Sequence, residues 1–570
     1  MKKVIVILSA VALILLLVLA GLLMFGSGLM GQSAPTTVVT TAAPTTLAPT
    51  TVATEPAPTG TEPPPAEPPF EPQMTADSDP ANWGMTWEVM ADGEVVESYQ
   101  RETAISFDDA DYFALPGVAT FRGNNYRSAP SYGTADISSG TMTQLWKTHV
   151  GHQADPKWGG CGWTGQPLVA QWDEETKAIM NLYEDKKQKK DLVEAIYAKM
   201  DGYVHFIDME DGSATRDPLY VGMVFKGSGA LDPRGYPLLY LGSGIAKGGK
   251  SQTMFVVNLI DCTIIHEISG ADQFALRRWY AFDSSPLVDG ETDTLIWPGE
   301  SGVLYTIKLN TQYDKAAGTI SVSPDQPVKA RYTHDYYRKG RYLGMEASAI
   351  AVKGYLYMAD NAGMLMCVNL NTMELVWAQD VIDDVNATPL FDWGEDGNGY
   401  LYLAPSLDYS NGGVQNEMPI YKLDARTGEI LWSHSMTCVT YDEISGGALA
   451  SPLMGKAGSD IEDLIIFTMG RSPSAWDGQM VALSKATGEV VWQTDVGNYA
   501  WSSPNVMYTS GGKSYILQSD ASGHFGLYEG ATGKLVSSVE LGATVEASPV
   551  VFNDRVLIGT RSGMYLFEIN

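Results

Sequence analysis

Three acidic residues stand at equivalent places in the chain, and their spacing could bring them together as ligands of a cation. Asp283, Glu346 and Glu546 each lie three residues before the end of a short signal of small residues that closes with Pro, or with Ala at position 349. If each signal opens the innermost strand of a repeated unit, the three carboxylates share a ring near one mouth of a central channel. Converging carboxylates repel one another, which raises a pKa or recruits a cation such as Ca²⁺. A hydrated polar channel without a bound ion is the alternative.

Two other groups of possible ligands fit structural roles better. Residues 392–399 alternate oxygen donors as a short calcium loop does, but they lack the distant bidentate Glu and fall between two expected strands, so a turn is favoured. His149, His152, Asp155 and Cys161 match no standard zinc spacing. The sequence also carries no nucleophile-elbow motif that would mark a hydrolase.

The elements that would position such a ring are repeated units. Self-similarity at intervals of about 40–66 residues indicates a repeat architecture, and each unit is long enough for four strands. The openings are Pro167, Pro233, Pro286, Ala349, Pro389, Pro452, Pro504 and Pro549. The residues three places before these openings form the expected ring: Thr164, Ala230, Asp283, Glu346, Asn386, Leu449, Trp501 and Glu546.

The units also end in a common way. The clearest endings contain Thr427, Gly428 and Trp432, then Thr487, Gly488 and Trp492, whereas the ending at Trp377 keeps the frame without the Gly. An Asp, Asn or Ser at the start of the ending can bond turn amides, and Gly supplies a positive φ. The Trp then stands on the outer strand, where we expect it to pack against the neighbouring unit.

These residues resemble the repeat of the PQQ-binding-like β-propeller family, the eight-bladed fold of quinoprotein alcohol dehydrogenases. Residues 482–492 follow its tryptophan-docking motif, and residues 120–127 resemble the Phe-Arg-Gly-Asn-x-x-Arg segment that precedes the first blade in exported members. The resemblance spans residues 119–570. It implies an all-β, eight-bladed propeller of four-stranded antiparallel blades.

Both ends of the repeat fit a closed ring. The last unit supplies three strands, at 549–552, 555–559 and 564–569, and the segment 144–150 with Trp146 resembles a missing outer strand. Pairing of these segments would remove exposed edges. Residues 76–118 lie outside the repeat, and a hairpin around Asp92 is expected to pack on the propeller.

The redox equipment of the resembled dehydrogenases is not recognisable. Those enzymes hold pyrroloquinoline quinone against a ring of two adjacent, disulfide-bonded cysteines, with a catalytic Asp and calcium ligands. The four cysteines of this chain, Cys161, Cys262, Cys367 and Cys438, are all far apart in sequence, and we interpret them as buried small hydrophobes. We therefore expect no quinone cofactor, with Ca²⁺ as the one possible ligand.

The N-terminus predicts a membrane anchor. Residues 4–25 carry no charge and would form a helix of about 33 Å, enough for a hydrocarbon core of about 30 Å. Two preceding lysines favour an uncleaved signal-anchor within residues 1–30, with the rest of the chain outside the cytoplasm. Residues 31–75 are rich in Thr and Pro, which is typical of an extended, disordered linker.

The net charge of −30 argues against a nucleic-acid partner. We expect a membrane-anchored, non-catalytic binding or scaffold module for surface proteins or cell-wall glycans. The alternatives are a PQQ-dependent dehydrogenase and a ligand or cation sensor that uses the channel mouth. The lysine-rich run 186–190 is interpreted as a solvated loop.

Overall fold

The computed structural model describes residues 70–107, 112–149, 159–161, 165–246 and 248–570. The predicted membrane helix and the Thr/Pro-rich linker lie outside these residues. Contacts between Cα atoms group residues 69–570 into one compact unit. In the described residues, no helix combines the length and the apolar character needed to cross a bilayer.

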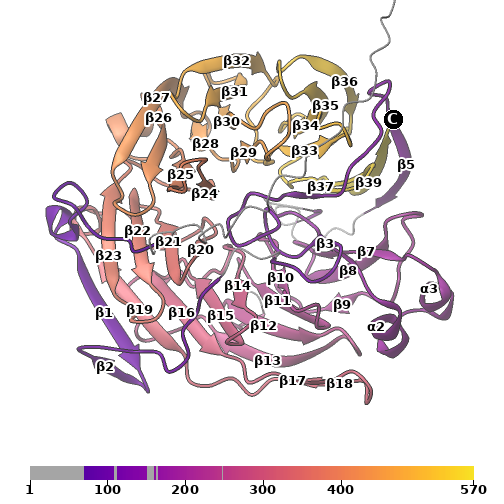
Figure 1. Ribbon diagram of the computed structural model, residues 1–570, viewed down its shortest axis with the longest axis horizontal. Helices are drawn as coiled ribbons and strands as arrows, with labels where there is room; N and C mark the ends of the chain where they lie inside the picture. The colour runs from indigo at the N-terminus through magenta and orange to yellow at the C-terminus, as the bar shows by residue number, and fades with distance from the viewer. Residues whose placement is uncertain (1–69, 108–111, 150–158, 162–164, 247) are drawn as a thin grey trace, which may run out of the picture. The chain divides into compact units, whose positions relative to one another are not determined.

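Eight antiparallel sheets follow one another along this unit and form the blades of a propeller (Figure 1). Each blade uses four successive strands, counted from the axis outward, and only the eighth blade takes its outer strand from elsewhere in the chain.

The strands of blades 1 to 4 are β6 (Leu168–Gln171), β7 (Val193–Ala198), β8 (Tyr203–Asp208), β9 (Leu219–Tyr220); β10 (Ala230–Leu231), β11 (Leu238–Gly242), β12 (Thr253–Asn258), β13 (Thr263–Ser269); β14 (Leu287–Asp289), β15 (Thr294–Pro298), β16 (Val303–Lys308), β19 (Val328–Thr333); and β20 (Ile350–Val352), β21 (Tyr355–Ala359), β22 (Met364–Asn369), β23 (Leu375–Asp380). Those of blades 5 to 8 are β24 (Leu390–Trp393), β25 (Gly399–Leu403), β26 (Gln415–Asp424), β27 (Ile430–Val439); β29 (Leu453–Met454), β30 (Leu464–Gly470), β31 (Gly478–Ser484), β32 (Val490–Asp495); β33 (Asn505–Tyr508), β34 (Ser514–Ser519), β35 (His524–Glu529), β36 (Leu535–Glu540); and β37 (Val550–Phe552), β38 (Arg555–Gly559), β39 (Gly563–Ile569), β5 (Met142–His149).

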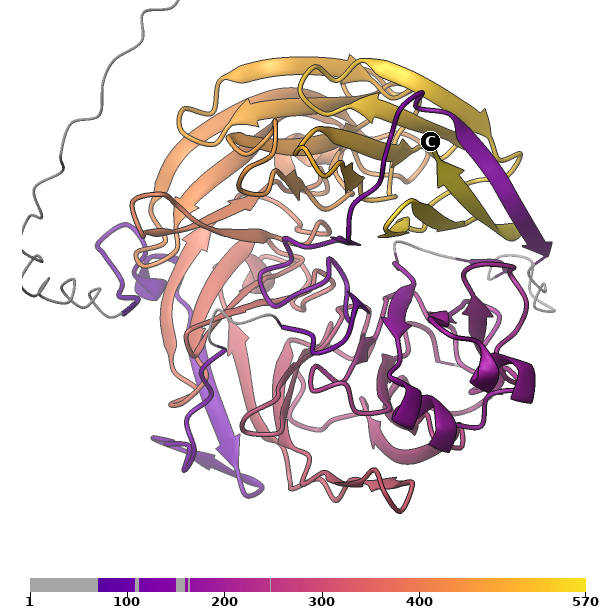
Figure 2. The same ribbon diagram turned by 45° about the vertical axis from the view of Figure 1, so that its right-hand side comes forward.

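The ring closes as the sequence predicts. Strand β5 pairs antiparallel with β39, with Trp146 opposite Leu566 and Gln144 opposite Phe567. Both views show β5, from early in the chain, beside the C-terminal β39 (Figures 1 and 2). The eighth blade is therefore completed by residues that precede the first.

Several short elements decorate the blades. The predicted N-terminal hairpin forms from β1 (Thr86–Ala91) and β2 (Glu94–Val96), and β1 pairs with β19, so that blade 3 gains two outer strands. The other additions are β3 (Gly117–Val118), β4 (Ser131–Tyr132), β17 (Gln312–Asp314), β18 (Thr319–Ser321), β28 (Gly447–Ala448), η1 (Pro80–Trp83), α2 (Glu174–Ile179), α3 (Glu184–Gln188), α4 (Asp335–Arg338) and η3 (Ser410–Gly413).

The lysine-rich run is not the solvated loop we expected. Its first residues belong to α3, and Lys186 and Lys189 both form ion pairs with the buried carboxylate of Asp208, at 2.7 and 2.5 Å. The acidic partner lies on β8, about 20 residues further along the chain, so the sequence run alone could not reveal it.

Burial explains the strand pattern. The second strands of blades 2 and 3, β11 and β15, are buried along their whole length, because neighbouring blades cover both of their faces. Outer strands such as β36 alternate exposed and half-buried residues. The apolar clusters accordingly lie between blades; one joins β30 and β31 to β25 and β26, and its residues are fully or almost fully buried.

The Trp and Gly of the predicted endings meet across four blade boundaries. Trp377 of blade 4 lies against Gly428 of blade 5, where an added Cβ would approach its Cε3 to 2.7 Å, and the indole N–H donates to the Ala425 carbonyl at 3.3 Å. Trp432 and Gly488 repeat this contact between blades 5 and 6. The same contact recurs at Trp492 with Gly533 and at Trp146 with Gly212. The Gly therefore provides both a positive φ and the space for the neighbouring indole.

Candidate binding site at the channel mouth

Small hydroxyl side chains join the blades around the axis. In blades 3 to 7, the backbone N–H just before the opening Pro or Ala donates to the hydroxyl of the next blade, as from Ser285 to Ser348 at 2.9 Å and from Ser348 to Thr388 at 3.0 Å. The series continues through Thr388 to Ser451, Ser451 to Ser503 and Ser503 to Ser548, at 2.9–3.0 Å. The Ser in the repeated opening thus links neighbouring blades, a role that its recurrence could have suggested.

The segment between β3 and β4 occupies the axis of the ring (Figure 1). Two fully buried arginines of this segment hold carbonyls of four blades. Arg122 donates to the carbonyls of Pro504 and Pro452 at 2.5 and 2.6 Å, and Arg127 donates to those of Ala349 and Ser285 at 2.8 and 2.9 Å. Burial lowers the pKa of Arg122 to about 9. The segment 120–127, which was recognised by its sequence motif, therefore connects the inner strands of four blades through these two arginines. We call it the hub.

The predicted ring is largely present. We call the face that carries the loops leading into the inner strands the upper face, and the opposite one the lower face. A cavity of about 30 Å³ at the axis is lined by five residues of the predicted ring: Asp283, Glu346, Asn386, Leu449 and Trp501. Thr164 lies outside the described residues.

Two members of the predicted ring are placed differently. Ala230 lies within β10 and is fully buried. The segment that leads into the inner strand of blade 2 is 226–229, which is earlier in the chain than the one predicted from Pro233. Lys226 takes the place of Ala230 in the cavity lining. Glu546 is not among the residues lining this cavity, and it forms an ion pair of 2.5 Å with Arg561.

The charged side chains in and beside the cavity interact strongly with one another. Lys226 forms an ion pair with Asp283. Glu300, from the loop between β15 and β16, is buried nearby and accepts a hydrogen bond from the Trp279 indole at 2.8 Å. Burial, together with the charges of Asp283 and Glu346, raises the pKa of Glu300 well above its ordinary value. Glu300 could not be found from the sequence, because its loop shares only a small residue followed by Gly with other blades and the residue type at position 300 differs among them.

Burial also raises the pKa of Glu346, while Lys226 opposes the shift. In the described residues, no group of three or more His, Cys, Asp or Glu side chains is arranged to hold a metal ion. Calcium binding by Asp283, Glu346 and Glu546 therefore stays a prediction, with Asp283 and Glu346 in one cavity and Glu546 outside its lining.

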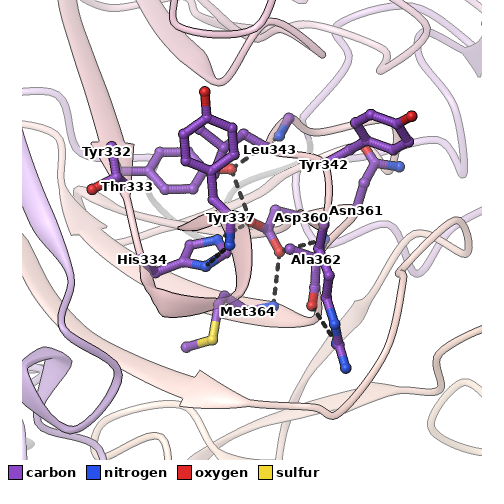
Figure 3. Close-up of polar contacts among 12 residues, drawn as sticks. Tyr332, Thr333, His334, Tyr337, Tyr342, Leu343, Asp360, Asn361, Ala362 and Met364 are labelled. Carbon is purple, nitrogen blue, oxygen red and sulfur yellow. Dashed lines mark hydrogen bonds and ion pairs between the residues drawn. The ribbon is translucent and has the colours of Figure 1, made fainter. Parts of the chain in front are cut away.

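A buried His–Asp pair beside the mouth has the look of a catalytic relay, yet its hydrogen bonds give it a structural role (Figure 3). His334 Nε2 lies 2.9 Å from an oxygen of Asp360, and its Nδ1 accepts the backbone N–H of Tyr337 at 3.3 Å. Asp360 also accepts the Tyr332 hydroxyl at 3.1 Å and the N–H of Met364 at 2.8 Å. Because both ring nitrogens are engaged, His334 has no nitrogen left to activate a nucleophile.

This network holds the loop between β19 and β20 in place, and the loop presents an aromatic residue to solvent. Arg341 donates to the carbonyls of Ala362 and Ile382, both at 2.8 Å. Tyr342 is 60% exposed, and the Arg277 guanidinium lies 4.9 Å from its ring centroid.

A second aromatic group lies on the upper face at the loops of blades 5 to 7. Arg471 is placed over the rings of Tyr441 and Tyr499, at 5.5 and 4.5 Å from their centroids. Tyr441 in turn contacts Trp476, which is 65% exposed. We define the aromatic rim as Trp279, Tyr342, Tyr441 and Trp476. Each member exposes apolar surface, and Tyr342 and Tyr441 are backed by a guanidinium.

The remaining predicted residues have structural positions. The loop at 392–399 is a turn between β24 and β25, in which Asp396 accepts hydrogen bonds from Asn398 and Tyr400. The four cysteines are free thiols, three of them buried and Cys262 partly so. His149 ends β5, Cys161 is buried, and the other two residues of that cluster lie outside the described part.

This architecture is similar to that of several known proteins. The family model described as outer membrane protein assembly factor BamB matches residues 325–496 and 476–567, which include the blades with the clearest endings. A quinohemoprotein alcohol dehydrogenase from Pseudomonas putida HK5 superposes with a TM-score of 0.55 at 12% identity, covering 82% of this chain and 83% of that one. The enzyme from Comamonas testosteroni gives 0.53 at 10% identity, with the same coverages. A europium-containing methanol dehydrogenase gives 0.52 at 10% identity, covering 80% of this chain and 98% of that one. No curated protein matches the sequence significantly.

Residues 325–567 therefore match this family model, and the chain as a whole has the fold of an eight-bladed β-propeller. Because the sequence identities are low, the similarity to these solved structures establishes the fold alone. The axial cavity does not fit pyrroloquinoline quinone: a volume of about 30 Å³ holds one or two water molecules, not a tricyclic molecule with three carboxylates. Its lining offers Asp283 and Glu346 to such an anion, and its Lys226 is already paired with Asp283.

Proposed function

We propose that this protein is a non-catalytic binding or scaffold module, held by its N-terminal segment at the outer side of a membrane. Its upper face would bind surface proteins or glycans. The observation that carries the proposal is the exposed aromatic rim on the upper face. Tyr and Trp supply large contact areas with little loss of side-chain entropy, and such residues dominate binding energy at interfaces.

The rigidity of this surface supports binding. Tyr342 lies on a loop fixed by the buried His334–Asp360 pair and by Arg341, so little ordering is needed when a partner arrives. Burial raises the pKa values of the Glu300 and Glu346 carboxyls, so both are easier to protonate than a free carboxyl when a partner covers the mouth.

The test compares upper-face variants with a control on the lower face. Full-length protein carrying both Tyr342→Ala and Trp476→Ala is crosslinked on its own cells, purified and compared with the unaltered protein. The control is Tyr132→Ala. Tyr132 is 36% exposed, and its backbone pairs with Phe552 at the lower end of β37. We expect the double variant to lose its crosslinked partner or glycan and the control to keep it. Equal capture by all three proteins would contradict the proposal, as would alcohol oxidation on addition of quinone and calcium.

A further inference from the structure

A groove on the lower face, between blades 5 and 6, is separate from the channel mouth. It has a volume of about 500 Å³, which is in the range of small-molecule sites. Its walls are the turn between β24 and β25, the loop between β29 and β30, and the turn after β31. We call it the lower groove.

Two buried polar groups line the lower groove: a hydroxyl without a hydrogen-bond partner and an ammonium without a carboxylate partner, both within the described residues. Tyr402 is fully buried, and its hydroxyl has no hydrogen-bond partner among the described residues. Lys422 is 8% exposed; its ammonium donates to the Lys485 carbonyl at 2.9 Å and lies 3.7 Å from the Tyr400 ring centroid. Within the described part of the chain, Lys422 has no ion pair with a carboxylate. A buried donor without an acceptor costs free energy, and a buried ammonium without a counter-charge does too, so Tyr402 and Lys422 together indicate an anionic ligand that supplies acceptors.

The charges of the groove restrict that ligand further. Lys485 forms an ion pair with Asp392 at 3.2 Å, so the charges of these two side chains cancel. The remaining charge in the interior of the groove is the positive charge of Lys422. Five charged residues are exposed at the rim and line the same groove, and acidic ones outnumber the single Lys456, so the rim is negative on balance. The acidic residues are Glu395, Asp396, Glu462 and Asp463. A polyanion such as a phosphate ester would be repelled at this rim, whereas a molecule with one negative and one positive end would not.

We propose that the lower groove binds the carboxylate of a small dipolar molecule, either a free amino acid or the C-terminus of a short peptide. The carboxylate accepts hydrogen bonds from the Lys422 ammonium and the Tyr402 hydroxyl. The ammonium group of the ligand faces the rim carboxylates. Because the groove and the aromatic rim lie on opposite faces, this site stands or falls independently of the proposed function.

Calorimetric titration of the full-length protein tests the proposal with four probes. L-alanine and L-alanyl-L-alanine carry both charges, whereas acetate and methylamine carry one each. We expect at least one of the two dipolar probes to bind, and acetate and methylamine to bind at least ten times more weakly. Preference for alanine identifies a free amino acid as the ligand, and preference for the dipeptide identifies a peptide end. Failure of both dipolar probes, or equal binding of acetate, would overturn the proposal.

Two variants connect binding to the groove. Lys422→Met should weaken the bound probe at least tenfold, and Tyr402→Phe about threefold to tenfold. Tyr357→Phe is the control, because Tyr357 is equally buried but its hydroxyl donates to Ala425 at 2.9 Å. Without ligand, Tyr402→Phe should leave the unfolding midpoint unchanged or higher, and Tyr357→Phe should lower it. Unchanged affinity in both Lys422→Met and Tyr402→Phe would refute the assignment even if a probe binds.

Discussion

Replacing Gly428 by Ala tests how the blades are joined. Gly428 has φ +73°, and a Cβ at this position would lie 2.7 Å from Cε3 of Trp377 on the preceding blade. Alanine at this backbone conformation costs about 1 kcal/mol. Displacement of the indole adds about 1–3 kcal/mol of overpacking and about 1 kcal/mol for the hydrogen bond to the Ala425 carbonyl. We therefore expect a loss of about 3–5 kcal/mol in the free energy of unfolding.

Gly397 in the same blade supplies a matched control. Its φ is +74°, nearly that of Gly428, but nothing lies within 4 Å of an added Cβ. Gly397→Ala should therefore cost only the backbone part, about 1 kcal/mol. Urea unfolding followed by tryptophan fluorescence measures both variants under one set of conditions.

The smaller ring of Trp377→Phe gives a further check. In that background, the extra cost of Gly428→Ala should shrink toward the cost of Gly397→Ala, because the clash is relieved. If Gly428→Ala and Gly397→Ala destabilise the protein equally, the contact between Trp and Gly does not join the blades and our explanation of the repeated ending is wrong.

Three further predictions concern other parts of the molecule. The raised pKa of Glu300 means that its contribution to stability is present below its ordinary value of 4.5 and is lost as pH rises; Glu300→Gln should flatten the decline of the unfolding free energy between pH 5 and 8, and parallel pH profiles would contradict this. Arg122→Met removes two charge-assisted hydrogen bonds to the carbonyls of blades 6 and 7, and part of that loss is offset by relief of the buried charge; the unfolding free energy should fall by about 2–4 kcal/mol, and an unchanged midpoint would show that the hub is dispensable. Deletion of residues 1–30 should move the protein from the membrane fraction to the soluble one, and retention on the membrane after the deletion would refute the predicted anchor.

The sequence predicted the fold because the signals of each blade are local. The turn that carries Thr427 and Gly428 uses residues close together in the chain, and the same is true of the Ser and Pro before each inner strand. The ring position of blade 2 was misplaced because residues 226–229 have Gly where other blades have Pro, which left Pro233 as the nearest match. The Trp146 strand was predicted because seven complete blades and a three-stranded remainder need one more strand.

The polar sites were harder to predict, since their partners come from distant segments. Glu300 meets the axial cavity through a loop that differs from blade to blade. Arg122 was visible as part of a motif, but its two carbonyl partners lie more than 300 residues away. The lower groove depends on Tyr402 lacking a partner, and no pattern of residue types can show that a hydroxyl is left unbonded.

The pairing of β5 with β39 also bears on how the protein is made. Synthesis produces β5 before the first blade, and its partner β39 follows only after the other seven blades. If secretion delivers the N-terminal part first, seven sheets can stack before the eighth has all of its strands, and the growing arc keeps two open flanks until β39 has been made. A chain truncated before residue 563 lacks β39 and cannot pair it with β5. Every such incomplete product therefore exposes the unpaired edge of β5 to quality-control proteases.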